Sequence, residues 1–565
     1  MCGGYGAQRG GENRVPHRLA TAKRRDCDRR PTQDWSEMAS NGNIHVVTKA
    51  DPPFLMHRGE SFVRERLPEG AHVIYPNPPL PALPDAREAI RRAIDHPLGQ
   101  DPLDAQLARG DIRRVTIAFD DVSLPLPRMR RPDVRQLVME VLLDKLDRAG
   151  VTDVHLICAI CLHRRITPRE MNYMLGPDLF RRFFPDRLYN HDAEDPDGNV
   201  HLGTTEKGEI VEINRRAAES DLLLYVNINL VTMDGGHKSV PVGLATYRSV
   251  RHHHNAHTML HDSSYMDPPA SLFHRSCERM GAIVAKHVKV FTVETTLNGD
   301  LFDPTLAFLQ KREHAWGARD RLMYSAMKTA LNLAPFPLRR KLYNALPAPY
   351  GLTGVHAGDT GAVHERTLVN VDRQQNVKVD RQYDVVLVGL PSIGPYNVNS
   401  ILNPILVQCL SAGYFFNFYR GRPLARRGGV MIVHHPVQEA FNTLHHPSYK
   451  DFYDECLPQT RDPKELEHRF EKRYAESDRY RDLYRNSYAY HGVHPFYMWY
   501  WGAHGMAHFG KVIAVQPQSR QACRRIGFEP AASLAEALEM AKAVVGPDPS
   551  IAYYHCPPVL MCDLR

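Results

Sequence analysis

The residues best suited to chemistry lie together in residues 233–254, which read MDGGHKSVPVGLATYRSVRHHH. A Gly-Gly pair there lets backbone amides approach an anion closely, and the following Ser239 adds a hydroxyl. Lys238 can pair with a phosphate or form a covalent link to an electrophilic cofactor. His254, sixteen residues after the lysine, can ligate a metal ion. Phosphate, covalent link and metal in one segment predict a nucleotide-derived metal cofactor.

Two other motifs lack the geometry of the sites they resemble. Cys158 and Cys161 form a C-x-x-C pair in a predicted strand, where residues three apart point to opposite faces. They are predicted to be buried apolar side chains. The sequence GGHKS ends like a phosphate-binding P-loop, but Thr232 stands where the first glycine of that motif belongs. The segment is therefore not a Walker motif.

Three histidines offer a competing metal site. His253, His257 and His261 are spaced so that a helix would present them on one face as zinc ligands. No H-E-x-x-H motif accompanies them, and a chain with 30 histidines produces such triplets by chance. A zinc hydrolase built on these residues is therefore the most distant alternative.

Short β-rich runs alternate with helical stretches from about residue 45. The predicted strands are 113–119, 154–160, 221–228, 385–390, 430–434 and 512–516. Between the first two, Pro132 marks a helix start, apolar residues recur at helical spacing, and Gly150 stands where that helix would end. Ser533 and Glu536 form a capping box that opens another helix. This alternation predicts an α/β fold, with parallel sheets covered by helices.

The length of 565 residues exceeds what one hydrophobic core holds, so at least two domains are expected. We predict two α/β domains, residues 45–285 and 286–565, with the active site in the cleft between them. The net charge of +7 comes without a compact basic stripe in the folded part, which argues against nucleic acid as a partner. Ten unpatterned cysteines suit a reducing compartment, so a cytoplasmic location is expected. No apolar run is long enough for a membrane span.

Two segments stand apart from this pattern. Residues 1–44 are Gly/Arg-rich with little to bury and are predicted to be a disordered tail; a mitochondrial-type presequence is the alternative, which the acidic residues of the segment oppose. Residues 303–353 show basic amphipathic helical patterns. They are expected to form a helical hairpin packed on the second domain, with a lid, a membrane-surface contact or an oligomer arm as alternatives.

Over most of residues 75–565 the chain resembles the nickel-pincer-nucleotide lactate racemase family. Residues 93–110 are similar to the segment before the family's first central strand, DDVSLPLP (120–127) to its Asp-x-Thr-Arg-Pro-x-Pro turn, and CLHRRITPRE (161–170) to its Gly-x-His-Arg-Pro loop. Residues 235–254 match its cofactor segment over their whole length, and HAGD (356–359) and GPYNVNSILNP (394–404) resemble parts of its second domain. Each match alone is weak, and the combination is specific.

The resemblance implies a role for each matching residue. His163 would be a catalytic base that takes the hydroxyl proton of a 2-hydroxy acid while the carbinol hydride moves to the cofactor's pyridinium ring. Lys238 would hold the cofactor through a thioamide, and His254 would ligate its nickel. The other implied residues are Gly235, Gly236, Ser239, Asp121 and Ser123 for the cofactor, and Tyr396 and Asn403 for the substrate. Asp121 and Ser123 are equally typical of a turn after a strand.

The chain also departs from the family's pattern. The family's second catalytic histidine, ten residues before the lysine, is Ile228 here, and the arginine of its Asp-x-Thr-Arg-Pro turn is Leu124. Its second-domain Gln and Lys fall at Asn403 and Leu406. Each lost charge-assisted contact removes roughly 1.5–3 kcal/mol of binding, so a larger or less acidic substrate than lactate is expected. The candidates to replace the missing base are His237, His252, His253 or a group in the 303–353 insert.

Three functions follow from the resemblance and these departures. The first is a racemase or epimerase of a 2-hydroxy acid or related polyol acid that uses the nickel-pincer nucleotide. The second is an enzyme with the same cofactor and a hydride-transfer reaction that needs one base. The third is a catalytically silent binding protein on the same fold. The expected partners are a small hydroxy-acid substrate and the enzymes that synthesise the cofactor; the oligomeric state is not predicted.

Overall fold

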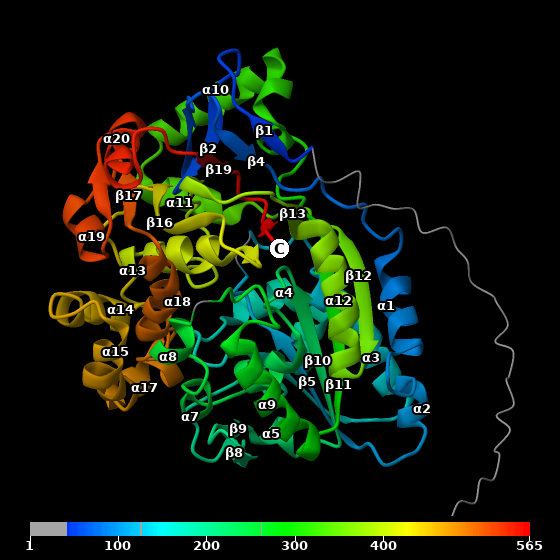
Figure 1. Cartoon of the computed structure of the whole chain (residues 1–565). Helices are drawn as coiled ribbons and strands as arrows, with labels where there is room; N and C mark the ends of the chain where they lie inside the picture. The colour runs from blue at the N-terminus through cyan, green and yellow to red at the C-terminus, as the bar shows by residue number, and fades with distance from the viewer. Residues whose placement is uncertain (1–41, 125–126, 262) are drawn as a thin grey trace, which may run out of the picture.

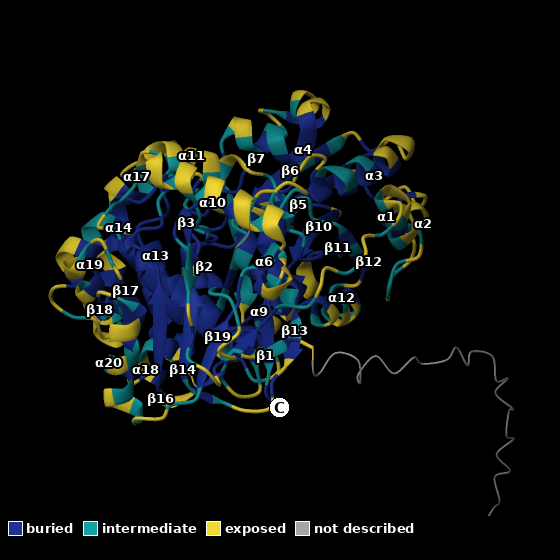
Figure 2. Cartoon of the chain, turned by 90° about the horizontal axis from the view of Figure 1, so that it is seen from above, coloured by how far each residue is buried: buried dark blue, intermediate teal, exposed yellow. Residues whose placement is uncertain are grey.

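The computed structural model describes residues 42–124, 127–261 and 263–565, so most of the predicted 1–44 tail lies outside the described residues. Two sheets, each covered by helices, lie one above the other in Figure 1. The structure thereby confirms the predicted α/β class. Figure 2 shows the strands of both sheets buried, with exposed residues gathered on the outer helices and loops.

The first sheet has six strands in the order β12-β11-β10-β5-β6-β7, and all neighbours are parallel except β11 and β12. These strands are β5 (Arg114–Asp120), β6 (Asp153–Ala159), β7 (Leu188–Asn190), β10 (Leu222–Asn229), β11 (Val290–Leu297) and β12 (Leu352–Gly358). Their near-continuous apolar sequence is typical of parallel strands that are covered on both faces.

The second sheet has seven strands in the order β1-β4-β19-β14-β16-β17-β18, parallel except for the β1–β4 pair. They are β1 (Ile44–Val46), β4 (His72–Ile74), β14 (Tyr383–Gly389), β16 (Ala425–His434), β17 (Lys511–Val515), β18 (Glu529–Ala531) and β19 (Ile551–Tyr554). All six strands predicted from the sequence are present in the two sheets, within five residues at each end.

The chain crosses between the two sheets more often than the sequence predicts. Strands β1 and β4, near the start of the described chain, pair in the second sheet, and β11 and β12 complete the first. A boundary between residues 285 and 286 therefore divides the first sheet, and the 45–285 segment includes strand β4 of the second. Long-range pairing of this kind has no local sequence signal, because the residue pattern of a strand does not determine which other strand pairs with it.

Eight of the helices are the longer ones that cover the sheets or form the insert: α1 (Ala86–Asp95), α3 (Val134–Arg148), α4 (Pro168–Phe183), α9 (Leu272–His287), α10 (Ala318–Leu333), α12 (Thr360–Gln375), α18 (His494–His508) and α20 (Leu534–Val545). The predicted Pro132–Gly150 helix is α3; Asp133 caps its start, and Gly150 has a φ of 73° after its end. Ser533 caps α20 as predicted, but Glu536 accepts a hydrogen bond from the Ala532 amide, so the capping box is incomplete.

The other elements are shorter, apart from the insert helix α11, which has ten residues like α1. The helices are α2 (Leu103–Leu107), α5 (Arg215–Ala218), α6 (Ser239–Gly243), α7 (Tyr247–Val250), α8 (Ala256–Met259), α11 (Phe336–Ala345), α13 (Pro404–Gln408), α14 (Pro447–Asp451), α15 (Pro463–Leu466), α16 (Lys472–Ala475), α17 (Asp478–Asn486) and α19 (Arg520–Arg525). The strands are β2 (Phe54–Arg58), β3 (Ser61–Glu65), β8 (Asn199–Thr204), β9 (Ile210–Asn214), β13 (Asn376–Lys378), β15 (Tyr419–Arg420) and β20 (Met561–Asp563). No helix in the described ranges is both long and apolar enough to cross a membrane.

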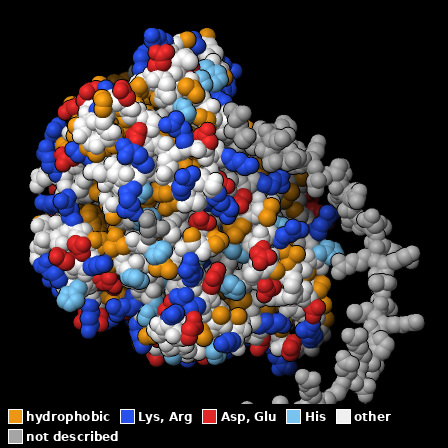
Figure 3. Space-filling model, viewed as in Figure 1, with side chains coloured by type: hydrophobic (Ala, Val, Ile, Leu, Met, Phe, Trp, Pro, Cys, Tyr) orange, Lys and Arg blue, Asp and Glu red, His pale blue; other side chains and the backbone are white. Residues whose placement is uncertain are grey.

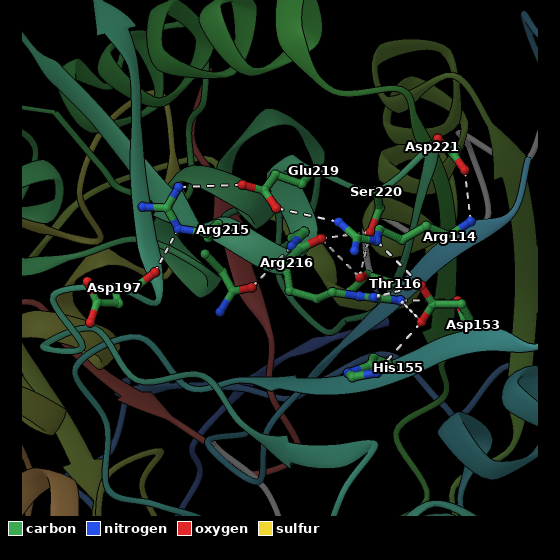
Figure 4. A network of polar contacts seen from close by, with 12 residues as sticks. Arg114, Thr116, Asp153, His155, Asp197, Arg215, Arg216, Glu219, Ser220 and Asp221 are labelled. Atoms are coloured by element: carbon green, nitrogen blue, oxygen red, sulfur yellow. Dashed lines mark hydrogen bonds and ion pairs between the residues drawn. The ribbon is translucent and has the colours of Figure 1, made fainter.

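Ion pairs and amide contacts join the amino ends of the central strands of the first sheet (Figure 4). Arg216 pairs with Asp153 at the start of β6, with a shortest N···O distance of 2.7 Å. Asp221, just before β10, accepts hydrogen bonds of 2.8 Å from the backbone amides of Arg113 and Arg114. The three strands are thereby held in register at the end opposite their carboxyl termini.

The 303–353 insert is helical, as predicted, and packs on the β2–β3 hairpin through a small apolar cluster that includes Phe62, Trp316 and Tyr324. A buried carboxylate, Glu313, joins this insert to the second sheet. It accepts hydrogen bonds from the Leu55 amide (2.8 Å) and the Tyr75 hydroxyl (2.6 Å). The imidazole of His555 lies 3.1 Å from the same carboxylate.

Replacing Glu313 with Ala should destabilise the protein by about 2–4 kcal/mol, because the Leu55 amide and Tyr75 hydroxyl would stay buried without an acceptor. Chemical denaturation of the full chain measures this loss. Glu539, which is exposed and pairs only with Lys542, provides the control, and its replacement with Ala should change stability by less than about 0.5 kcal/mol. Equal effects of the two substitutions would contradict the role assigned to Glu313.

A second buried carboxyl, Glu471, lies where α18 meets α7. The hydroxyls of Tyr247 and Tyr500 donate to it at 3.3 and 3.0 Å. Burial, together with the charge of nearby Glu467, raises the pKa of Glu471 to about 7. The folded protein therefore holds this proton more tightly than the unfolded chain, in which the pKa is about 4.5.

Glu471 should therefore make stability fall as pH rises from about 4.5 to about 7, because the folded state must then bury a charge. Replacing Glu471 with Gln should remove that fall and leave the variant about 1–3 kcal/mol more stable than the wild type above pH 7. Denaturation curves recorded across pH 4–8 for the variant, the wild type and an exposed control, Glu476→Gln, would show this. A wild-type pH profile that persists in Glu471→Gln would exclude this carboxyl as its cause.

Candidate functional site

Three predicted residues meet where the central strands of the first sheet end. Asp121 and Ser123 follow β5, and His163 follows β6; because these strands are parallel neighbours, their carboxyl ends lie side by side. The Nδ1 atom of His163 lies 2.8 Å from Oδ2 of Asp121. The amide and hydroxyl of Ser123 donate to the same carboxylate at 2.7 and 3.0 Å. The local sequence thus forms a buried Asp–His pair.

The charge on Asp121 fixes the orientation of His163. Burial raises the pKa of Asp121, but the adjacent His163 and the two hydrogen bonds from Ser123 lower it by more in total, so the net shift is downward. An ionised carboxylate holds Nδ1 of His163 in its protonated form and leaves Nε2 as the basic nitrogen. Within the described ranges, no hydrogen bond engages that Nε2 atom.

Aromatic side chains from the C-terminal half of the chain enclose His163. Its ring centre lies 5.3 Å from that of Tyr396, 6.1 Å from that of Tyr490 and 5.4 Å from that of His494. The predicted substrate-binding residue Tyr396 is therefore beside the predicted base. Its hydroxyl lies 2.8 Å from that of Tyr414. The site is assembled from the carboxyl ends of strands in the first sheet and from two loops and the start of α18 in the C-terminal half.

His494 is the functional residue that sequence reasoning missed. It is the first residue of α18, is 2% exposed, and lies with Nδ1 2.6 Å from the Tyr449 hydroxyl. Its Nε2 atom is buried and has no hydrogen-bond partner among the described residues. Burial lowers the pKa of His494 well below that of a free imidazole, and the nearby His163 adds to the effect. The only signal for it in the sequence is that it precedes Pro495. A proline in the first turn is typical of a helix start, so the sequence places this histidine at the beginning of a helix.

The Gly-Gly pair has a different role from the one its sequence predicts. Gly235 and Gly236 have φ angles of 78° and 62°, and a Cβ at Gly236 would lie 2.7 Å from the ring of His364. The amide of Gly236 donates to the buried carboxylate of Glu294 at 2.6 Å. The anion that this backbone approaches is therefore the protein's own Glu294. Both positions require glycine for their backbone conformation and for space.

His254 is an electrostatic neighbour of both Lys238 and His163. The nearest ionic partner of Lys238 is Asp234, 3.8 Å away. The ring of His254 stacks on Trp501 with ring centres 5.5 Å apart, and its Nδ1 lies 2.7 Å from that of His253. Burial lowers the pKa of His254 strongly, and the charges of His253, Lys238 and His163 lower it further. A neutral imidazole is the form that ligates a metal.

The other predicted residues are bound internally. Ser239 donates its hydroxyl to Asn227 at 2.9 Å. Asn403 caps α13 by accepting from the Leu406 amide, while its buried Nδ2 has no partner in the described chain. Ile228 stands at the position that a second catalytic histidine occupies in the family it resembles. Its side chain is 2% exposed, and its backbone amide donates a hydrogen bond to the carboxylate of Asp120. Burial is the main reason that the pKa of Asp120 rises to about 7.

Two of the proposed replacements for the missing base are engaged elsewhere. His253 is fully buried against His254, and the side chain of His237 packs against Gly281 of α9. The zinc alternative also fails, because α8 covers only Ala256–Met259 and so does not place His253, His257 and His261 on one helical face. Within the described ranges, no three His, Cys, Asp or Glu side chains form a metal-binding group.

A cavity of about 840 Å³ adjoins this cluster. Its lining includes Val122, Arg164 and Asn397, which directly follow Asp121, His163 and Tyr396 in the chain. Leu124 and residues of α11 line it as well. Arg164 in its wall is bound to Glu170 at 2.7 Å. Arg169 and Lys341 also line the cavity and form no ion pair with any described residue. The cavity has the size of a site for a ligand larger than a three-carbon acid.

Part of the chain is similar in sequence to known proteins. Residues 59–267 match the lactate racemase N-terminal domain. Lactate racemase of Lactiplantibacillus plantarum is 26% identical over 221 residues, which are 38% of this chain and 48% of that protein. Lactate racemase of Thermoanaerobacterium thermosaccharolyticum is 26% identical over 172 residues, 30% of this chain and 38% of that protein. The matched segments thus span at most about half the length of these relatives.

The fold likeness extends further than the sequence likeness. The structure of the lactate racemase apoprotein from Thermoanaerobacterium thermosaccharolyticum superimposes with a TM-score of 0.56 over 90% of this chain and 100% of that one, at 19% identity. At that identity the superposition establishes a shared α/β fold. The matched domain and the two relatives thus show that this part of the chain is similar to lactate racemases.

Proposed function

We propose that the protein is a nickel-pincer-nucleotide-dependent racemase or epimerase of a 2-hydroxy acid or related polyol acid, and that lactate is not its substrate. The observation that carries this proposal is the pair His163 and His494, whose ring centres lie 5.4 Å apart and which are both electrostatic neighbours of His254. Each histidine has one nitrogen in a polar contact, and no described residue hydrogen-bonds to the other. Inverting a carbinol centre requires such proton handling for both enantiomers.

The residues present fit the cofactor that the family resemblance implies. Lys238 would hold it covalently, since no described residue is an ionic partner of its ammonium at less than 3.8 Å. His254 would be the protein ligand of nickel, with His253 fixing its ring. Because His254 is not part of a larger cluster of ligands in the described chain, the other donors would come from the cofactor itself. The bound group would supply the site that accepts and returns the carbinol hydride.

His163 would take the hydroxyl proton of one enantiomer at Nε2. Asp121 would hold the imidazole through Nδ1 and stabilise its positive charge once the proton has moved. The mainly aromatic surroundings of Tyr396, Tyr490 and His494 would exclude water from the transfer.

His494 would serve the other enantiomer in place of the histidine that is Ile228 here. It comes from the C-terminal half of the chain, faces His163, and has the required unbonded Nε2. The two rings are in contact, so a substrate reaches both only when the elements that carry them separate. The site would thus close over its substrate from two sides.

The proposed substrate is larger than lactate. The position of the family's carboxylate-binding arginine is Leu124, which lines the 840 Å³ cavity instead of offering a charge. Arg169 and Lys341 in the same wall are available for an acidic group farther from the carbinol. A one-base hydride transfer and a silent binding protein remain the competing functions, and the experiments below separate them.

Lys238→Ala should abolish cofactor attachment. In a host that also produces the cofactor-making enzymes, the wild type should carry a cofactor-sized mass adduct with about one nickel per chain, and the variant should carry neither. Intact-protein mass spectrometry and metal analysis measure both quantities. Lys289→Ala, on the surface between α9 and β11, is the matched control. Wild-type protein without adduct or nickel under these conditions would leave the silent binding protein as the better description.

His163→Asn and His494→Asn should each keep the adduct and nickel and lose racemisation by about 10²–10⁴-fold. The measurement is enantiomer interconversion across a panel of hydroxy acids, with single-turnover reactions started from each enantiomer. Each variant should fail at proton removal from a different enantiomer. His504→Asn, farther along α18, is the control. A His494→Asn protein that racemises at the wild-type rate would show that His494 is not the second base.

A further inference from the structure

The outer surface of the 303–353 insert concentrates exposed apolar side chains. Ten large hydrophobic residues are exposed among the described residues, and six of them lie between positions 322 and 346. They are Leu322 (70% exposed), Met323 (36%), Leu333 (80%), Leu338 (47%), Leu342 (51%) and Leu346 (47%). Single exposed leucines are ordinary, whereas such a group marks an interaction surface. We call these six residues the insert face.

Helical spacing accounts for this exposure. Leu338, Leu342 and Leu346 follow one another every four residues along α11 and its end, so they share one side. The opposite sides of the insert helices are anchored: Tyr324 packs with Phe62, and Arg340 pairs with Glu60. Figure 2 shows exposed residues on α10 and α11, both on the side of the molecule turned to the viewer. The leucines point outward because the inner contacts are already made.

The charge around the insert face is positive. Residues 318–346 contain six Lys and Arg residues but only one acidic residue, Asp320. Arg340 is buried against Glu60, and the exposed cations are Arg319, Arg321 and Lys341. Asp320 is itself paired with Lys311. In Figure 3, Lys and Arg side chains accompany hydrophobic ones at the top of the molecule, where Figure 1 places α10. A two-fold contact between copies would set these cations against each other, so self-association is disfavoured.

We propose that the insert face docks on an anionic lipid membrane surface. Exposed leucines flanked by Arg and Lys are the composition of helices that lie in the plane of a bilayer, with the apolar side chains among the lipid chains and the cations at the headgroups. The contact is peripheral, since no described helix can span a membrane. It is independent of the proposed reaction, although Lys341 and Leu346 also line the 840 Å³ cavity, so α11 would connect the membrane to that wall.

The test is sedimentation of the full chain with lipid vesicles. The wild type should bind vesicles that contain about one third phosphatidylserine and not those of phosphatidylcholine alone, and binding should weaken as salt is raised. The double variant Leu338→Asp/Leu342→Asp should reduce the bound fraction at least about tenfold. Arg321→Glu/Lys341→Glu should act similarly. Leu444→Asp is the matched control, because Leu444 is also 51% exposed but lies far along the chain from the insert.

The controls make each outcome decisive. All proteins share the basic N-terminal segment, so a difference between variants isolates the insert face. Unchanged thermal unfolding is expected in every variant, because the replaced side chains are exposed. Absence of binding to anionic vesicles, or equal binding by wild type and both double variants, would overturn the proposal. The proposal would also be overturned if light scattering found the wild type to be a dimer and Leu338→Asp/Leu342→Asp to be a monomer. That result would show that the insert face binds a second copy of the chain.

Discussion

The buried carboxylate of Asp121 is the constraint on which the site depends. A charge in this position is stable only with close partners, and the chain supplies Ser123 from the same turn and His163 from the neighbouring strand end. Those partners meet because β5 and β6 are parallel and end at the same edge, while ion pairs such as Arg216–Asp153 hold their opposite ends. The fold therefore fixes which nitrogen of His163 is basic.

The second constraint is that one half of the chain cannot complete this site. His163 comes from the first sheet, whereas Tyr396, Tyr490 and His494 come from the C-terminal half. In the proposed mechanism Ile228 cannot carry a proton, so a second proton carrier would have to come from another element. Its proposed place on α18 would make proton transfer depend on how the two halves approach each other, a form of control that two histidines on one sheet would not provide.

Local sequence patterns predicted many of the strands and helices. They did not predict features that depend on contacts between residues far apart in the chain. The six strands and α3 follow from apolar runs and from helix spacing with a glycine at the end. The domain boundary did not follow, because the pairing of β4, β11 and β12 is long-range. Lys238, His254 and His163 were predicted from their motifs, whereas no motif indicated His494, which more than half of the chain separates from His163. The Gly-Gly pair was predicted to approach a cofactor anion, and in the structure the Gly236 amide donates to Glu294.

The most direct test of the account is racemisation in deuterium oxide with cofactor-loaded enzyme and a hydroxy acid that it interconverts. In the proposed mechanism the two histidines would move the hydroxyl proton, while the carbon-bound hydrogen would travel as hydride and would not exchange with water. Mass spectrometry of the product should therefore find the original hydrogen on the carbinol carbon. Deuterium at that carbon would show that a histidine removes the carbon-bound hydrogen as a proton, and would contradict the hydride-transfer account.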